Sequence, residues 1–198
     1  MKSNVCTISQ DSDSLKNILK ESEKFALYSE LDKKQTGRLR LLAEELVGML
    51  PELLGFSTGE FWIEGDGKAF ELHTKLLPNV SLTAERREKI LSVSKSGKNF
   101  AAQGIMNKIR LAAEFMMIDY NDASNALPAD MDFYSVGSCS LPMFSSMAWS
   151  LNEYRAKSEG KKGEAWDELE KSIIANIADD VLVAVRGSAV EIIVKKHF

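Results

Sequence analysis

The chain has 198 residues, of which 44% are hydrophobic, and its 25 basic and 29 acidic residues give a formal net charge of -4. This length and hydrophobic content suffice for one domain with its own core. The slight acidic excess excludes the broad cationic surface with which proteins hold a nucleic-acid backbone. The first residues lack a signal-peptide core and no run of about 18 apolar residues occurs, so we expect a cytoplasmic protein that does not bind membranes.

The cysteines and histidines do not have the spacing of a metal site. Cys6 and Cys139 lie far apart, and His73 and His197 belong to separate predicted strands. Zinc motifs instead place their ligands in closely spaced pairs. We therefore expect free thiols, no metal ligands among these four residues, and structural or surface roles for both histidines.

The N-terminal part of the chain predicts one strand followed by two helices. β-branched residues between Val5 and Ser9 favour a short strand. Apolar residues at helical spacing predict one helix from Ser14 to Leu31 and another, beginning after Asp32, from Lys33 to Leu54. Pro51 is expected to kink or shorten the last turns of the second helix.

Two hairpins are the clearest short-range patterns. Residues 60–64 and 69–75 alternate between polar and apolar side chains around an Asp66-Gly67 turn, and residues 181–185 and 190–194 alternate around Gly187. Alternating runs joined by such turns are typical of antiparallel strands. The first hairpin has one polar and one apolar face, as expected of a sheet that helices cover on one side only.

The middle of the chain predicts further helices around a polar loop. Charged residues 82–93 and the more apolar Gly104 to Ile118 are typical of helices, and residues 94–99 between them of a loop. Residues 119–165 predict an insertion whose methionine and aromatic side chains either fill a core or bind a partner. If this insertion folds over the loop, it would occlude a site there.

The later segments complete the predicted fold. A helix is expected at residues 145–154 within the insertion, and another at residues 164–177 before the final hairpin. The whole pattern predicts a single α+β domain at residues 1–198. It is a two-layer sandwich in which helices cover one face of a mixed, mostly antiparallel sheet.

Three segments of the chain carry a family resemblance. They are Arg40 to Met49 with its Ala-Glu-Glu-Leu sequence, Ser96-Gly97-Lys98 through Gly104 to Arg110, and Asp179 to Lys195. In this order they resemble the N-box helix, the ATP lid with its following helix, and the closing strands of the GHKL superfamily, whose fold they imply. Within that superfamily the chain most resembles the bacterial anti-sigma-factor serine kinases, over most of its length apart from about residues 119–165.

The resemblance implies a nucleotide site. Glu45 takes the place of the general base that activates the attacking hydroxyl in transfer of a phosphoryl group from Mg-ATP to a protein serine, and Glu44 lies beside it in the sequence. Glycine amides and a helix N-terminus favour anions, as a lid over phosphates requires. The lid residues implied in this way are Ser96, Gly97, Lys98, Asn99 and Gly104.

Two positions depart from the family pattern. Met49 stands one helical turn after Glu45, where the family has an Asn that helps to hold magnesium, and a thioether cannot supply that oxygen. The segment from His73 to Asn79 lacks the Asp and Gly residues with which the family binds adenine. The resemblance therefore implies a regulatory protein, with a sigma-factor-like partner, whose nucleotide chemistry is weakened or lost.

Other interpretations of the same residues remain open. One of Glu44 and Glu45 could be solvated while the other pairs with Arg38 or Arg40, and Lys98 could be an ordinary loop charge. The alternative function is a non-catalytic module on the same fold, without ATP or magnesium, that sequesters a protein partner. A third is a structural protein or homodimer that binds no ligand.

Overall fold

The computed structural model describes residues 1–9, 12–48, 58–77, 148–158, 172–186 and 189–198, together with Ile105, Ile109 and Ala112. These residues form an α+β structure around a six-stranded sheet in the order β1-β2-β3-β6-β5-β4. The strands are β1 (Cys6–Ile8), β2 (Thr58–Asp66), β3 (Ala69–Leu77), β4 (Ala148–Ser150), β5 (Asp180–Arg186) and β6 (Ala189–His197). The helices are α1 (Ser12–Tyr28), α2 (Lys33–Gly48), α6 (Leu151–Ser158) and α8 (Ile173–Ile177).

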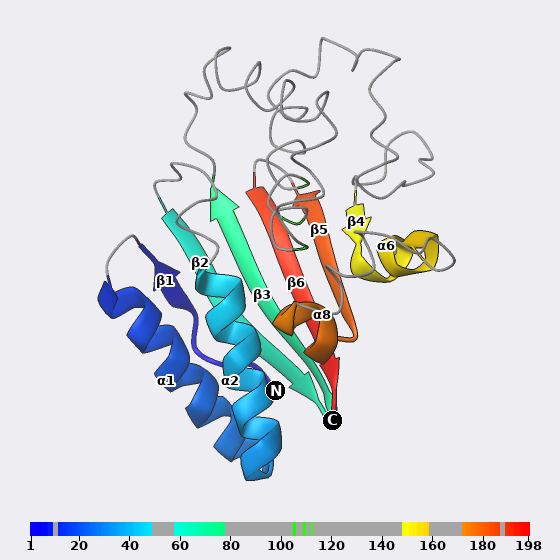
Figure 1. Ribbon diagram of the computed structural model, residues 1–198. Coiled ribbons are helices and arrows are strands. Elements are labelled where there is room, and N and C mark those ends of the chain that lie inside the picture. The colour runs from blue at the N-terminus through cyan, green and yellow to red at the C-terminus, as the bar shows by residue number, and fades with distance from the viewer. Residues whose placement is uncertain are drawn as a thin grey trace.

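Helices α1, α2 and α8 cover one face of the sheet, and α6 lies beside the edge strand β4 (Figure 1). All five strand pairings between the described strands are antiparallel. The expected α+β class and the helix-covered face are thus confirmed, whereas the prediction of a mixed sheet is wrong for the described strands. The tight connections of the β2–β3 and β5–β6 hairpins require those two pairings to be antiparallel.

The core lies between the sheet and these helices. Along β3, every second side chain from Phe70 to Leu76 is buried, and the residues between them are only partly buried. Helix α2 contributes a matching apolar face that is fully enclosed, including Leu39, Leu42 and Leu46. Burial of each such side chain stabilises the fold by about 1.5–3 kcal/mol, so these two surfaces hold the layers together.

The predicted first hairpin is confirmed, and its turn is tight. Asp66 pairs with Ala69, which leaves Gly67 and Lys68 as the two central residues. Gly67 has a φ of 59° and Lys68 does not have a positive φ, which is the pattern of a type II′ turn. Glycine is required at the first central position because side chains disfavour that conformation.

The connection between α1 and α2 is built by two local motifs. Glu30 adopts a left-handed φ of 55°, and the N–H groups of Glu30 and Leu31 donate to the carbonyls of Leu27 and Ala26 at 3.1 Å each. This is a Schellman motif, which ends α1 with a glutamate where glycine is usual. The predicted helix end at Leu31 is therefore a few residues too late.

Asp32 then begins α2, as the sequence predicts. Its carboxylate accepts the N–H of Gln35 at 2.8 Å, and the Gln35 side chain accepts the N–H of Asp32 at 3.0 Å. This reciprocal capping box satisfies two backbone donors that the first turn would otherwise leave free. The described part of α2 ends at Gly48, and the expected continuation to Leu54 lies outside the described residues.

The helix predicted at residues 145–154 is wrong at its beginning. Ala148–Ser150 form the strand β4, which pairs with β5 and buries Trp149. The helix α6 starts only at Leu151, because the Ser150 hydroxyl accepts the N–H of Glu153 and caps the first turn. Part of the predicted insertion is thus a strand of the same sheet.

The helix predicted at residues 164–177 is also corrected. Ser172 has an extended backbone, with φ -87° and ψ 125°, and its side chain accepts the N–H of Ala175. Ser172 is therefore an N-cap, and the helix that ends at Ile177 begins at Ile173. The predicted residues 164–171 lie outside the described residues. Ile105, Ile109 and Ala112 are helical and buried, as expected within the helix predicted at 104–118. The helix predicted at 82–93 and the loop at 94–99 lie outside the described residues.

We predict opposite effects of alanine at two glycines. In α2, a Cβ at Gly37 would meet nothing within 4 Å, so Gly37→Ala should raise the free energy of unfolding by about 0.5–1 kcal/mol through lower backbone entropy loss. In β2, a Cβ at Gly59 would lie 2.9 Å from Leu76 Cδ2, so Gly59→Ala should lower it by about 1–3 kcal/mol. Urea unfolding measures both, and equal effects at the two sites would contradict the described packing.

Candidate functional site

Helix α2 carries the first candidate residues, and its neighbours define where they point. Arg40 forms an ion pair with Glu23 of α1, so this side of α2 faces α1. At about 100° of rotation per residue, Glu45 lies about 140° further round the helix. Helix α2 also contacts α8, which lies on the other side of α2 from α1 (Figure 1). Glu45 therefore lies on the flank of α2 away from α1.

Glu44 and Glu45 differ in their surroundings. The side of α2 bearing Glu44 is exposed, and Glu45 is half-buried. Within the segments that the structure describes, neither carboxylate takes part in a hydrogen bond or an ion pair. The suggested pairing with Arg40 does not occur, because Arg40 binds Glu23 instead. Glu45 is thus a partly desolvated carboxylate without a bound cation among the described residues.

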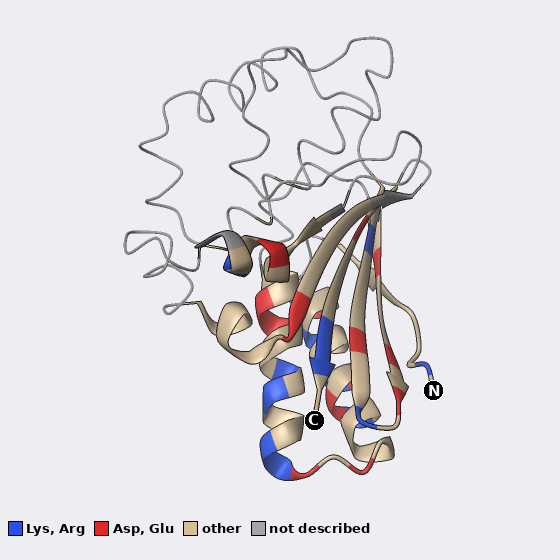
Figure 2. Cartoon of the chain, turned by 90° about the vertical axis from the view of Figure 1, so that its right-hand side faces the viewer, with Lys and Arg blue, Asp and Glu red and all other residues tan. Residues whose placement is uncertain are grey.

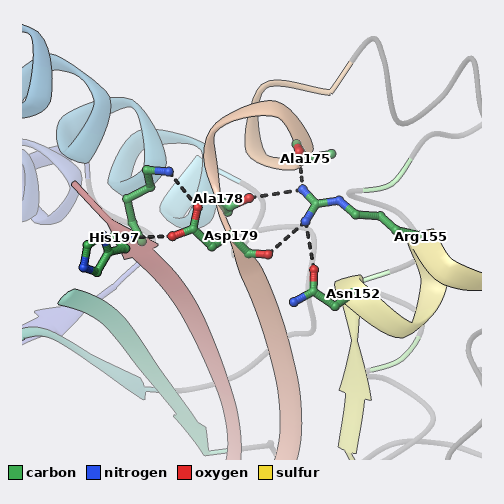
Figure 3. A network of polar contacts seen from close by, with 7 residues as sticks. Asn152, Arg155, Ala175, Ala178, Asp179 and His197 are labelled. Atoms are coloured by element: carbon green, nitrogen blue, oxygen red, sulfur yellow. Dashed lines mark hydrogen bonds and ion pairs between the residues drawn. The ribbon is translucent and has the colours of Figure 1, made fainter. Parts of the chain in front are cut away.

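Helix α8, which packs against α2, is held in position by Arg155 of α6. The guanidinium donates to the carbonyls of Ala175, Ala178 and Asp179 and to the side chain of Asn152 (Figure 3). The bonds to Ala178, Asp179 and Asn152 measure 3.1, 2.9 and 3.0 Å. A planar fork of donors at the end of a helix satisfies carbonyls that the helix leaves free and is favoured by the helix dipole.

Two aspartates extend this network to the sheet. Asp179 accepts hydrogen bonds from the Lys196 ammonium at 2.7 Å and from the backbone N–H of His197. Burial by itself would raise the pKa of Asp179, but these two donors outweigh it and hold the pKa below its ordinary value. Asp180 accepts from the Ser150 hydroxyl and from the N–H of Asn152, so it joins β5 to the start of α6.

We predict that Arg155→Lys lowers the free energy of unfolding by about 1–3 kcal/mol, because an ammonium cannot bridge several carbonyls as the guanidinium fork does. Arg40→Lys is the matched control, since its ion pair with Glu23 is exposed and should contribute no more than about 1 kcal/mol. Chemical unfolding of both variants tests this prediction. Equal losses would show that Arg155 does not have a special role.

His73 does not lie near Glu45. It belongs to the partly buried set of β3 side chains, whereas its neighbours Leu72 and Thr74 face the core under the helices. Successive side chains of a strand point to opposite faces of the sheet. His73 is therefore on the face opposite α2, and the structure does not bring these two predicted site residues together.

On that opposite face, His73 is part of an aromatic stack. Its ring lies parallel to the Trp62 indole, with an interplanar angle of 3° and centroids 4.9 Å apart. On the other side of β2, the Lys2 ammonium lies 4.6 Å from the centroid of the Trp62 ring. The indole N–H of Trp62 donates to Glu64 at 2.8 Å. The indole is thus held between a cation and an imidazole.

The imidazole is surrounded by several charged groups. Glu71 Oε2 lies 3.3 Å from His73 Nε2, yet this buried nitrogen makes no hydrogen bond. Burial is the main influence and lowers the pKa of His73; the nearby Lys2 lowers it further, while Glu64, Glu71 and Glu191 oppose the shift. Glu71 is also paired with Lys195 at 3.3 Å, which divides its charge between two partners.

The lowered pKa of His73 predicts a loss of stability on acidification. Below the unfolded pKa of about 6.5, the unfolded chain binds a proton that the folded chain resists, so the free energy of unfolding falls as the pH drops from about 7 to about 5. His73→Phe keeps an aromatic ring stacked on Trp62 but removes the titratable imidazole. The free energy of unfolding of this variant should therefore change less between pH 7 and pH 5. An unchanged slope in urea unfolding would contradict the assignment.

Six further predicted site residues lie outside the described residues: Met49, Ser96, Gly97, Lys98, Asn99 and Gly104. Among the residues that are described, no three His, Cys, Asp or Glu side chains are grouped as metal ligands.

The Trp62–His73 pair was missed at the sequence level, although a signal for it existed. A two-residue turn at Gly67-Lys68 makes Trp62 and His73 direct neighbours across the hairpin. The Arg155 network had no such local signal, because the three carbonyls that Arg155 binds are 20 to 24 residues away in the chain.

Comparison with known proteins gives no relative for this chain: no family model matches it, and neither curated proteins nor solved structures yield a match. None of the helices in the described segments is both long and apolar enough to cross a membrane.

Proposed function

We propose that this chain is a cytoplasmic regulatory protein of the anti-sigma-factor kinase type, on a GHKL-like scaffold, in which ATP-dependent phosphoryl transfer is weakened. The carboxylate of Glu45 carries the proposal. It is half-buried on the flank of α2 away from α1 and has no ion-pair partner in the described segments. A carboxylate in such a position is free to accept a proton from an attacking hydroxyl.

The order of the elements supports the same proposal. The described elements follow one another in the order on which the resemblance rests. They are strand β1, helices α1 and α2, the β2–β3 hairpin, the buried helical residues Ile105 and Ile109, and the β5–β6 hairpin. Mg-ATP, when bound, would supply the phosphoryl group. Glu45 would orient the serine hydroxyl and take its proton.

The residues expected around the nucleotide fit it only in part. Met49 cannot replace an oxygen ligand for magnesium, and His73 lies across the sheet from Glu45 in the Trp62 stack. The acceptor expected to bind adenine is therefore not provided by His73. Because phosphoryl transfer depends on positioning and charge neutralisation, these departures should reduce its rate strongly.

The same departures favour one alternative, a non-catalytic module that sequesters a partner protein. In that function the GHKL-like scaffold would be retained for its surface and Glu45 would have no chemical role. A sigma-factor-like regulator is the partner class that the sequence resemblance suggests.

Nucleotide binding separates the two functions. We predict that Mg-ADP at millimolar concentration raises the Tm of the full chain, since a ligand at a hundredfold excess over its Kd adds about 2.7 kcal/mol to the free energy of unfolding. Thermal unfolding with and without Mg-ADP measures this. No change in Tm would exclude the nucleotide-dependent proposal and favour the sequestering module.

A pair of variants then tests the role of Glu45. Glu45→Gln should leave the Mg-ADP shift in place and lower phosphate release from ATP by about 100-fold or more, as for loss of a general base. Glu44→Gln is the control on the exposed neighbour and should change neither quantity. If Glu45→Gln instead abolishes the Tm shift, Glu45 binds the nucleotide and is not the base.

A further inference from the structure

The outward face of α2 has a composition that contacts among the described residues do not explain. At about 100° per residue, four residues of this face fall within an arc of about 80°. They are Lys34, Gly37, Leu41 and Glu44. Lys34, Leu41 and Glu44 are exposed, and Gly37 is partly exposed. Within the described residues, neither Lys34 nor Glu44 has an ion pair or a hydrogen bond.

The charges on this helix run against its own dipole. Lys33, Lys34 and Arg38 occupy the N-terminal half of α2, and Glu44 and Glu45 occupy the C-terminal half, as Figure 2 shows by blue and red segments along the helix. The first turn holds no acidic residue and the last turn no basic residue. A helix N-terminus favours anions and a C-terminus favours cations. The Asp32 carboxylate at the N-cap fits this rule, whereas the charges within α2 are placed unfavourably for an isolated helix.

The centre of the same face combines a projecting apolar side chain, Leu41, with an open position at Gly37. Leu41 is an exposed large apolar residue, with 41% of its surface accessible. Gly37, one turn earlier, has open space where a Cβ would point. Glycine inside a helix lowers its stability relative to alanine, and no side chain in the described segments packs at this position in return.

These three features are explained together by a second copy of the chain. We propose that α2 packs antiparallel against α2 of an identical subunit across a two-fold axis level with Leu39. About this midpoint Leu41 lies opposite Gly37 of the partner subunit, and Lys34 lies opposite Glu44 of the partner subunit. A two-fold axis makes each contact occur twice, as in other isologous interfaces. The basic N-terminal half of each α2 then lies beside the acidic C-terminal half of the other α2. The two helix dipoles are antiparallel, which is their favourable arrangement.

The size and chemistry of this face of α2 determine the affinity of the dimer. A single helix face is smaller than the roughly 800 Å² per partner of a standard stable interface, so the dimer forms reversibly and depends on concentration. Its ion pairs are exposed at the rim, so salt weakens it. Glu45 lies at the edge of the face and is not required for the contact.

Sedimentation equilibrium of the full chain over a range of concentrations tests the proposal. Wild type should show a monomer–dimer equilibrium that weakens in about 1 M NaCl, where the Debye length is about 3 Å. Lys34→Glu and Glu44→Lys should each weaken dimerisation by more than about tenfold, because like charges then face each other twice. The double variant Lys34→Glu/Glu44→Lys restores opposite charges and should recover the affinity of wild type.

Gly37→Leu gives an independent test that does not depend on charge. It blocks the place that receives Leu41 and should abolish the dimer, while the Tm of the monomer stays the same or rises, since leucine is a good helix former. Lys20→Glu, on the exposed side of α1, is the control and should leave dimerisation unchanged. A chain that is monomeric at all concentrations, a double variant that does not recover, or a Gly37→Leu variant that still dimerises would each overturn the proposal.

Discussion

The pairing of β3 with β6 is the contact on which the rest of the structure depends. It joins the N-terminal hairpin to the C-terminal hairpin in one sheet, through eight aligned pairs from Ala69↔His197 to Leu76↔Val190. At its centre the hydroxyl of Thr74, which is fully buried, donates to the carbonyl of Ile192 at 3.2 Å. A slip of one residue in this register would move every side chain of β3 to the other face. The positions of both candidate functional surfaces follow from this one register.

The register also gives the two faces of the sheet different chemistry. Under the helices the sheet is apolar and supports α2, on which Glu45 lies. On the other face, Trp62 and His73 form a stack among Lys2, Glu64 and Glu71, where proton uptake is the available chemistry. Any reaction that uses Glu45 is therefore separated from the titration of His73 by the thickness of the sheet. The outward side of α2 is a third surface, and its charges concern association rather than catalysis.

Local signals in the sequence predicted those parts of the fold that are local in space. The hairpin at Gly67, the start of α2 at Asp32 and the apolar face of α2 each depend on residues within a few positions of one another. Strand β4 was missed because it is a three-residue edge strand whose partner, Leu182 to Ala184, lies more than 30 residues later. The break at Ser172 was missed because the apolar spacing continues on both sides of the cap.

The candidate site was predicted only in part for a related reason. Glu45 could be located from its helix, since helical spacing alone shows that it borders the buried face. His73 was assigned from its place in a family pattern, whereas the alternation along β3 puts it on the far side of the sheet.

The distance along the chain between contacting residues also bears on the order in which the elements form. The α1–α2 hairpin closes through contacts between near neighbours, but Thr74 and Ile192 are 118 residues apart. Because closing a long loop is entropically costly and slow, the helical hairpin is able to form first and offer its apolar face to the strands. By the same argument, we expect the β3–β6 pairing to form after the local β2–β3 and β5–β6 hairpins.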